Sequence, residues 1–94
     1  MRRAANLDSN QPDIVDALRK AGASVTSTAG VGNGFPDLAV GVRGVTVLME
    51  VKDGSKPPSH RKLTSPEREW HGAWRGSVFV VESVEQALKI LSTL

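Results

Sequence analysis

Residues 37–52 read DLAVGVRGVTVLMEVK and contain the clearest structural pattern of the sequence. Apolar side chains recur at every second position on both sides of Arg43-Gly44, as in two half-buried strands joined by a tight turn. The apolar positions are Leu38, Val40, Val42, Val45, Val47, Met49 and Val51. We therefore expect strands over residues 37–42 and 45–52 that form a hairpin and pack one face against a core.

A hairpin that turns symmetrically about Arg43-Gly44 sets Asp37 opposite Glu50. Their Cβ atoms would then lie about 5 Å apart, on the face that points away from the core. Opposed carboxylates destabilise a sheet, and a hard divalent cation such as Mg²⁺ or Mn²⁺, which takes oxygen ligands from both, would compensate. Lys52 stands two residues beyond Glu50 and points to the same side. The register thus predicts a metal site made by Asp37 and Glu50, with Lys52 beside it.

Two alternatives stay open at this point. Arg-Gly is not the preferred pair for a type I′ turn, because arginine is unfavourable at positive φ, and a three-residue loop would shift the register and separate the carboxylates. In the second alternative, Asp37 and Glu50 are only solvated residues at strand ends, with Lys52 as their counter-ion.

The residues before the hairpin predict one helix and one strand. Residues 9–11 offer possible caps, Pro12 stands in the first turn, and apolar residues at helical spacing run on to Gly22. A β-branched strand over residues 24–28 and a glycine-rich loop over residues 30–34 follow. We interpret this loop as a flexible connector.

The residues after the hairpin predict a loop, two helices and a strand. Residues 53–63 carry glycine, proline and most of the local positive charge, and they form the loop. Thr64 and Glu67 fit a capping box that starts a helix. The continuous apolar run over residues 77–81 predicts a strand covered on both faces, and a last helix starts at Ser83. The order of helix, three strands, helix, strand and helix predicts an α/β fold, a small mixed sheet with flanking helices.

Composition narrows the classes of function. A chain of 94 residues is too short to bury two separate cores, so residues 1–94 are expected to form one domain with one site. The sequence has no cysteine, which excludes disulfides, thiolate zinc sites and cysteine nucleophiles. No apolar run approaches the roughly 18 residues that span a bilayer, so we expect no membrane partner and a cytoplasmic location. The formal charge of +2 permits nucleic-acid binding without demanding it.

Further residues are candidates for the site. Gln11 shares the apolar stripe of the first helix, so it should point toward the sheet and could help to hold the metal, directly or through water. Asp8, just before the helix, is the carboxylate alternative. Basic residues that follow the hairpin are expected to contact phosphates, because such contacts supply affinity without sequence preference. These residues are Lys56, Arg61, Lys62 and, on the next helix, Arg68.

Pro36-Asp37, twelve intervening residues and Glu50-Val51-Lys52 resemble the signature of the PD-(D/E)XK nuclease superfamily. The order of elements resembles the αβββαβ restriction-endonuclease-like core of that superfamily, with a C-terminal helix added. The chain as a whole is similar to the VRR-NUC family, in its stand-alone phage and bacterial type. The similar segments are Gln11 and residues 34–38, 49–52, 63–71 and 80–83.

The resemblance implies a Mg²⁺-dependent endonuclease. It implies that Asp37, Glu50 and the carbonyl of Val51 coordinate the metal, and that Lys52 positions or activates the attacking water. Stand-alone members resemble Holliday-junction resolvases, which implies a homodimer that acts on four-way DNA junctions in a bacterial or phage-infected cell. The rival hypothesis is a non-catalytic module that binds DNA or RNA through the basic loop.

Two positions depart from the family pattern. The Val-Arg-Arg-like segment that names the family reads Val80-Val81-Glu82 here, so an arginine contact near that strand end is absent. The first helix also has no clear glutamate at the expected acidic position, which leaves the third metal ligand open between Asp8 and Gln11.

Overall fold

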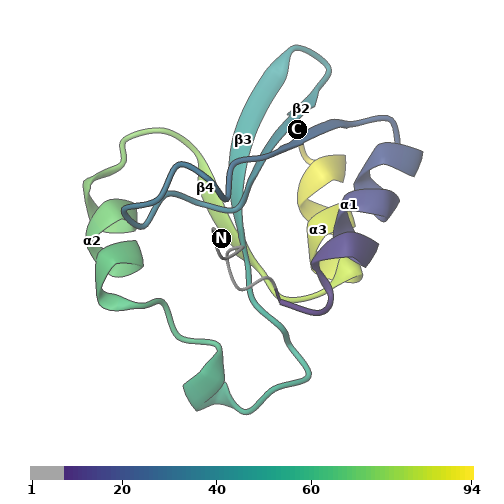
Figure 1. The fold of residues 1–94 in the computed structure, drawn as a ribbon. Coiled ribbons are helices and arrows are strands. Elements are labelled where there is room, and N and C mark those ends of the chain that lie inside the picture. Colours follow the sequence, from purple (N-terminus) through teal and green to yellow (C-terminus); the bar gives the residue numbers. More distant parts are fainter. Residues whose placement is uncertain (1–7) are drawn as a thin grey trace.

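A computed structural model describes residues 8–94 and shows the expected order of elements (Figure 1). The elements are α1 (Gln11–Lys20), β1 (Ser24–Ser27), β2 (Leu38–Val42), β3 (Val45–Val51), α2 (Ser65–Ala73), β4 (Val78–Val81) and α3 (Val84–Ser92), with a short 3₁₀ helix η1 (Pro58–His60) between β3 and α2. The prediction of helix, three strands, helix, strand and helix is therefore confirmed. The loop over residues 53–63 differs only in containing η1.

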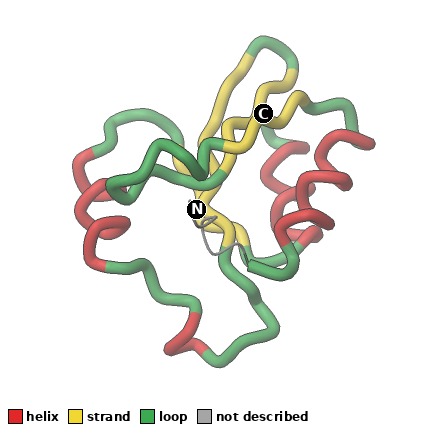
Figure 2. The backbone as a smooth tube through the Cα atoms, viewed as in Figure 1, coloured by secondary structure: helices red, strands yellow, loops and turns green. Residues whose placement is uncertain are grey.

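The four strands form one mixed sheet in the order β1-β2-β3-β4. The pairs β1·β2 and β2·β3 are antiparallel, whereas β3 and β4 run parallel. A parallel pair needs a long crossover connection. Figure 2 shows this crossover as the long loop that leaves β3, passes through η1 and α2, and returns to β4.

The hairpin has the symmetric register that the alternation predicts. The paired positions are Leu38 with Met49, Val40 with Val47, and Val42 with Val45. Arg43 has φ 49° and Gly44 has φ 76°, so both central residues have the positive φ that a type I′ turn requires. The alternative three-residue turn is therefore wrong, and the carboxylates are not separated by a register shift.

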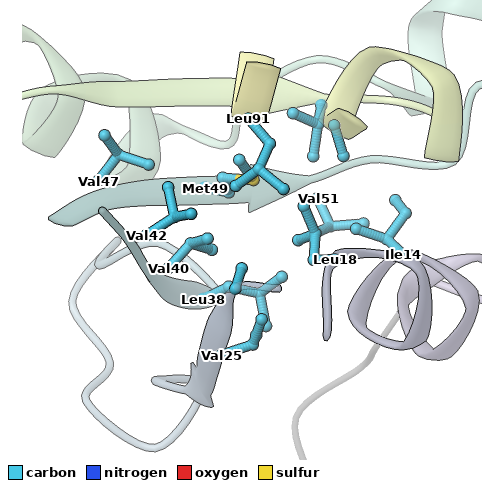
Figure 3. Close-up of a cluster of buried hydrophobic side chains, with 13 residues drawn as sticks. Ile14, Leu18, Val25, Leu38, Val40, Val42, Val47, Met49, Val51 and Leu91 are labelled. Carbon is cyan, nitrogen blue, oxygen red and sulfur yellow. The ribbon is translucent and has the colours of Figure 1, made fainter. Parts of the chain in front are cut away.

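Helices α1 and α3 lie together on one side of the sheet, and α2 lies on the other side (Figure 1). The core lies under α1 and α3, where Ile14 and Leu18 of α1 and Leu91 of α3 meet the inner face of β2 and β3 (Figure 3). Burial alternates along β2, as one covered face requires. No residue of α2 is buried, so α2 adds little to this core.

Strand β4 differs from its prediction. The continuous apolar run predicts a strand that is covered on both faces, but β4 is an edge strand and Val80 is 39% exposed. Helices α1 and α3 cover one face of the sheet, and Val80, which pairs with Glu50, is exposed on the other face. Within residues 8–94, no helix has the length and apolar character needed to cross a membrane.

Candidate metal centre

Asp37 lies one residue before β2, where the hairpin ladder ends. The pairing of Leu38 with Met49, continued by one residue, sets Asp37 opposite Glu50, and a second step sets Pro36 opposite Val51. At this point a side chain replaces the backbone acceptor of the ladder: Oδ2 of Asp37 accepts a hydrogen bond of 2.7 Å from the Val51 amide. The Pro36 carbonyl instead accepts a hydrogen bond of 2.7 Å from the Thr28 hydroxyl. Asp37 is thus held beside Glu50 by the backbone of β3.

Glu50 is a buried carboxyl group with an incomplete set of partners. It is 2% exposed, and among residues 8–94 no donor reaches its Oε1, which is also buried. Burial, followed by the neighbouring Asp37 carboxylate, raises the pKa of Glu50 to about 9. Burial also raises the pKa of Asp37. A buried acid whose ionisation is opposed by a second carboxylate is a physical sign of a cation site, because a bound cation favours the charged forms of both.

Lys52 completes the group at the end of β3. Its Nζ lies 2.8 Å from Glu67 Oε1 and 3.6 Å from Glu50 Oε2. Burial opposes the charge of this lysine, but the hydrogen bond to Glu67 and the charges of Glu67, Glu50 and Asp8 outweigh it and raise the pKa of Lys52. Lys52 is therefore a cation at neutral pH, suited to stabilising negative charge rather than to accepting a proton.

The donor set around Asp37 and Glu50 consists of oxygen atoms. The amide and carbonyl of one strand residue point to the same side, so the Val51 carbonyl is directed toward β2 together with the amide that bonds Asp37. Within residues 8–94, no group of three or more histidine, cysteine or acidic side chains could hold a metal. Two carboxylates, one carbonyl and water fit Mg²⁺, which takes oxygen ligands and keeps several waters.

The two candidates for a third ligand lie at the start of α1. Gln11 is the first residue of α1, and its side chain is buried. Within the described residues no hydrogen bond joins it to Asp37 or Glu50. Gln11 instead lines a cavity of about 340 Å³ together with Ser27 of β1. Asp8 lies 3.7 Å from Lys56, and its charge also acts on Lys52. The site thus has Asp8 within electrostatic range, while Gln11 contacts neither carboxylate through a hydrogen bond.

Asn10 is a residue whose role the sequence does not reveal. It precedes α1 as the N-cap, yet its side chain makes no capping hydrogen bond. Its Nδ2 donates to the carbonyls of Lys52 at 3.1 Å and Glu82 at 3.0 Å. Asn10 therefore joins the ends of β3 and β4 next to the proposed site. A possible cap is all that its position in the sequence indicates, because the two carbonyls come from distant segments.

The four basic residues expected at phosphates fall into two pairs. Two of them form ion pairs: Lys56 Nζ lies 3.7 Å from Asp8 Oδ1, and Arg61 Nη1 lies 3.2 Å from Glu82 Oε1. Lys62 and Arg68 are exposed and form no ion pair within residues 8–94. Among the four, Lys62 and Arg68 are therefore the residues whose charges are most accessible to a phosphate.

An open groove of about 430 Å³ leads to the site between the glycine-rich loop and the start of α2. Asp37 and Glu67 both line it. The loop that forms its other wall is not a free connector, since Phe35 packs edge-on against Trp70 of α2 with ring centroids 5.1 Å apart. Gly34 approaches the Pro66 carbonyl so closely that a Cβ there would overlap it. The groove therefore has two walls that are in contact with each other.

Comparison with known proteins adds one clear likeness. No family model matches the sequence. A search of curated proteins found no match either. A solved structure described as a "VRR_NUC domain" matches with 30% sequence identity and a TM-score of 0.62, over 87% of this chain and 89% of the other. At this identity and coverage the likeness extends to the family as well as the fold. The chain therefore belongs to the VRR-NUC family of nuclease domains and has its restriction-endonuclease-like fold.

Proposed function

We propose that the chain is a metal-dependent endodeoxyribonuclease whose Mg²⁺ or Mn²⁺ is held by Asp37, Glu50 and the Val51 carbonyl. The observation that carries this proposal is the buried Glu50 next to Asp37: Glu50 Oε1 has no partner among the described residues, and the neighbouring Asp37 opposes the ionisation of Glu50. The membership of a nuclease family agrees with this chemistry. Asp8 or Gln11 adds a further ligand, directly or through water.

A bound divalent cation would supply a water of lowered pKa and neutralise part of the phosphate charge. The chain supplies the rest. Lys52 holds its ammonium beside the carboxylates and stabilises the additional negative charge that develops on the attacked phosphate. The groove lined by Asp37 and Glu67 admits the DNA backbone, and the glycine residues on its other wall let that backbone approach closely.

Affinity for DNA in this proposal comes from the basic residues near the site. Lys62 and Arg68 bind phosphates, while Lys56 and Arg61 contribute from their ion pairs with acidic neighbours. A symmetric homodimer would present two such sites to two strands of a four-way junction. This dimer, the junction preference and a cytoplasmic location are expectations from the family resemblance and the sequence.

The decisive experiment compares cutting with binding. A labelled four-way junction and a linear duplex of the same length are incubated with the protein and Mg²⁺, with EDTA, and with the Lys52→Ala variant. We expect paired symmetric nicks in the junction that need Mg²⁺ and are lost with Lys52→Ala. Retained binding of DNA without any metal-dependent nicking would instead identify a non-catalytic binding module, the second candidate.

A further inference from the structure

Glu67 serves two partners through one oxygen atom. Its Oε1 accepts a hydrogen bond of 2.8 Å from the Thr64 amide, as the capping box of α2 requires, and another of 2.8 Å from Lys52 Nζ. The Glu67 amide completes the box by donating to Thr64 Oγ1 at 3.3 Å. The capping carboxylate of α2 is therefore also the closest partner of the lysine on β3.

This contact joins α2 to the sheet at the site. The side chain of Lys52 is 11% exposed and that of Glu67 is 19% exposed, so water screens their attraction only in part. No residue of α2 is buried. Gly34 of the glycine-rich loop approaches Pro66, the adjoining Phe35 packs against Trp70, and the Glu67 side chain also faces that of Glu50. The position of Glu67 thus depends on the loop from one side and on Lys52 from the other.

Lys52 has a second carboxylate within reach, and this one belongs to the proposed metal site. Glu50 Oε2 lies 3.6 Å from Lys52 Nζ, against 2.8 Å for Glu67 Oε1. If Glu67 were absent, Glu50 would be the one carboxylate within 4 Å of the ammonium among residues 8–94, with the charge of Asp8 acting from farther away. An ammonium that pairs with Glu50 competes with a cation for the same carboxylate, because both act as its counter-charge.

We propose that Glu67 is a positioning residue that holds the Lys52 ammonium away from Glu50. Its carboxylate keeps Glu50 free for the divalent cation and keeps the ammonium at the edge of the groove, which Glu67 itself lines. The inference rests on the proposed function, in which Glu50 binds the metal and Lys52 acts on the phosphate. The capping box explains why a residue on a helix with no buried face can hold this position.

Three variants separate positioning from helix capping. Glu67→Ala removes both hydrogen bonds, Glu67→Gln keeps an acceptor oxygen for both donors but loses the charge, and Thr64→Ala removes the other half of the capping box while leaving the carboxylate. Three readouts apply to each: acylation of Lys52 in metal-free protein by mass spectrometry, Mg²⁺ affinity without DNA by calorimetry, and kcat and KM for nicking.

With Glu67→Ala we expect faster acylation of Lys52, Mg²⁺ affinity that is several-fold weaker, and a fall in kcat of roughly ten- to a hundredfold with little change in KM. Glu67→Gln should recover most of the protection of Lys52 and part of kcat. Thr64→Ala should destabilise α2 yet leave Lys52 protected and Mg²⁺ affinity near that of the unaltered protein.

Equal losses in Thr64→Ala and Glu67→Ala on all three readouts would overturn the inference, because Glu67 would then act only as a cap. A Mg²⁺ affinity that stays unchanged in Glu67→Ala would overturn it as well. If the unaltered protein nicks no DNA at all, the proposed function fails, while acylation and Mg²⁺ binding still test the position of Lys52.

Discussion

The side chain of Arg43, in the hairpin turn, caps the C-terminal end of α3 at Leu91. Its Nη2 donates to the Leu91 carbonyl at 2.8 Å and its Nε donates to the Leu94 carbonyl at 3.0 Å. A cation at this end of a helix also meets the negative end of the helix dipole. These contacts offset the unfavourable positive φ of Arg43, and the turn that keeps Asp37 opposite Glu50 is thereby anchored to α3.

Arg43→Ala is therefore expected to lower the free energy of unfolding by about 2 kcal/mol, because two carbonyls lose a charged donor. Urea unfolding followed by circular dichroism measures this change. Arg43→Asn is the matched variant, since asparagine suits positive φ but cannot reach α3. We expect it to recover only part of the loss. Full stability in Arg43→Asn would show that the cap contributes nothing.

Gly34→Ala is expected to separate the glycine-rich loop from α2, because the new Cβ would overlap the Pro66 carbonyl. Gly32→Ala is the matched control: Gly34 has φ +82° and Gly32 has φ +78°, but a Cβ at Gly32 meets nothing within 4 Å. Both variants incur the backbone strain, and only Gly34→Ala adds the overlap. We expect it to be less stable than Gly32→Ala by about 1–3 kcal/mol in urea unfolding.

The same pair of variants also reports on Lys52. Displacement of α2 carries Glu67 with it, so Gly34→Ala should expose Lys52 to acylation while Gly32→Ala should not. Equal stability and equal acylation of the two variants would contradict the close contact between the loop and α2.

The stability of the metal-free protein is expected to fall as pH rises. The pKa of Glu50 is about 9 in the folded protein, against an ordinary value of 4.5. Between these two values the folded state binds a proton that the unfolded chain has released, so the free energy of unfolding decreases with increasing pH. Thermal unfolding in EDTA from about pH 5 to pH 9 should show a falling Tm.

Glu50→Gln tests the source of this pH dependence, because an amide of the same shape has no proton to lose. The slope of Tm against pH should flatten in Glu50→Gln and stay unchanged in Glu85→Gln, which replaces an exposed glutamate of α3. An equal slope in the unaltered protein and in Glu50→Gln would assign the effect to another group.

Lys62→Gln and Arg68→Gln are expected to weaken DNA binding evenly across sequences. Each phosphate contact that is lost should reduce the slope of log K against log salt by about 0.9. Fluorescence anisotropy with a labelled duplex at several salt concentrations measures the slope. Lys89→Gln, an exposed position on α3 away from the groove, should leave the slope unchanged. Slopes that do not respond to any of the three would remove Lys62 and Arg68 from the DNA interface.

The sequence determined the hairpin and its register, and with them the meeting of Asp37 and Glu50. A slip of one residue would turn every apolar side chain of one strand to the wrong face, so the alternating pattern together with a two-residue turn favours this register. The positive φ of Arg43 shows that the turn has this length. The Thr64–Glu67 capping box was also predictable, because both of its partners lie within one helical turn. Interactions of this kind can be predicted because they depend on residues that are close in the sequence or on a regular alternation of apolar side chains.

Contacts between segments that are far apart in the sequence set which groups complete the site. The contact of Lys52 with Glu67 crosses the connection between β3 and α2, and Asn10 reaches the ends of β3 and β4 from a remote segment. The exposed face of β4 was missed for a related reason: a continuous apolar run has the same composition whether a second layer covers it or not. Local periodicity sets which face a strand buries, but the packing of the whole chain sets what lies against that face.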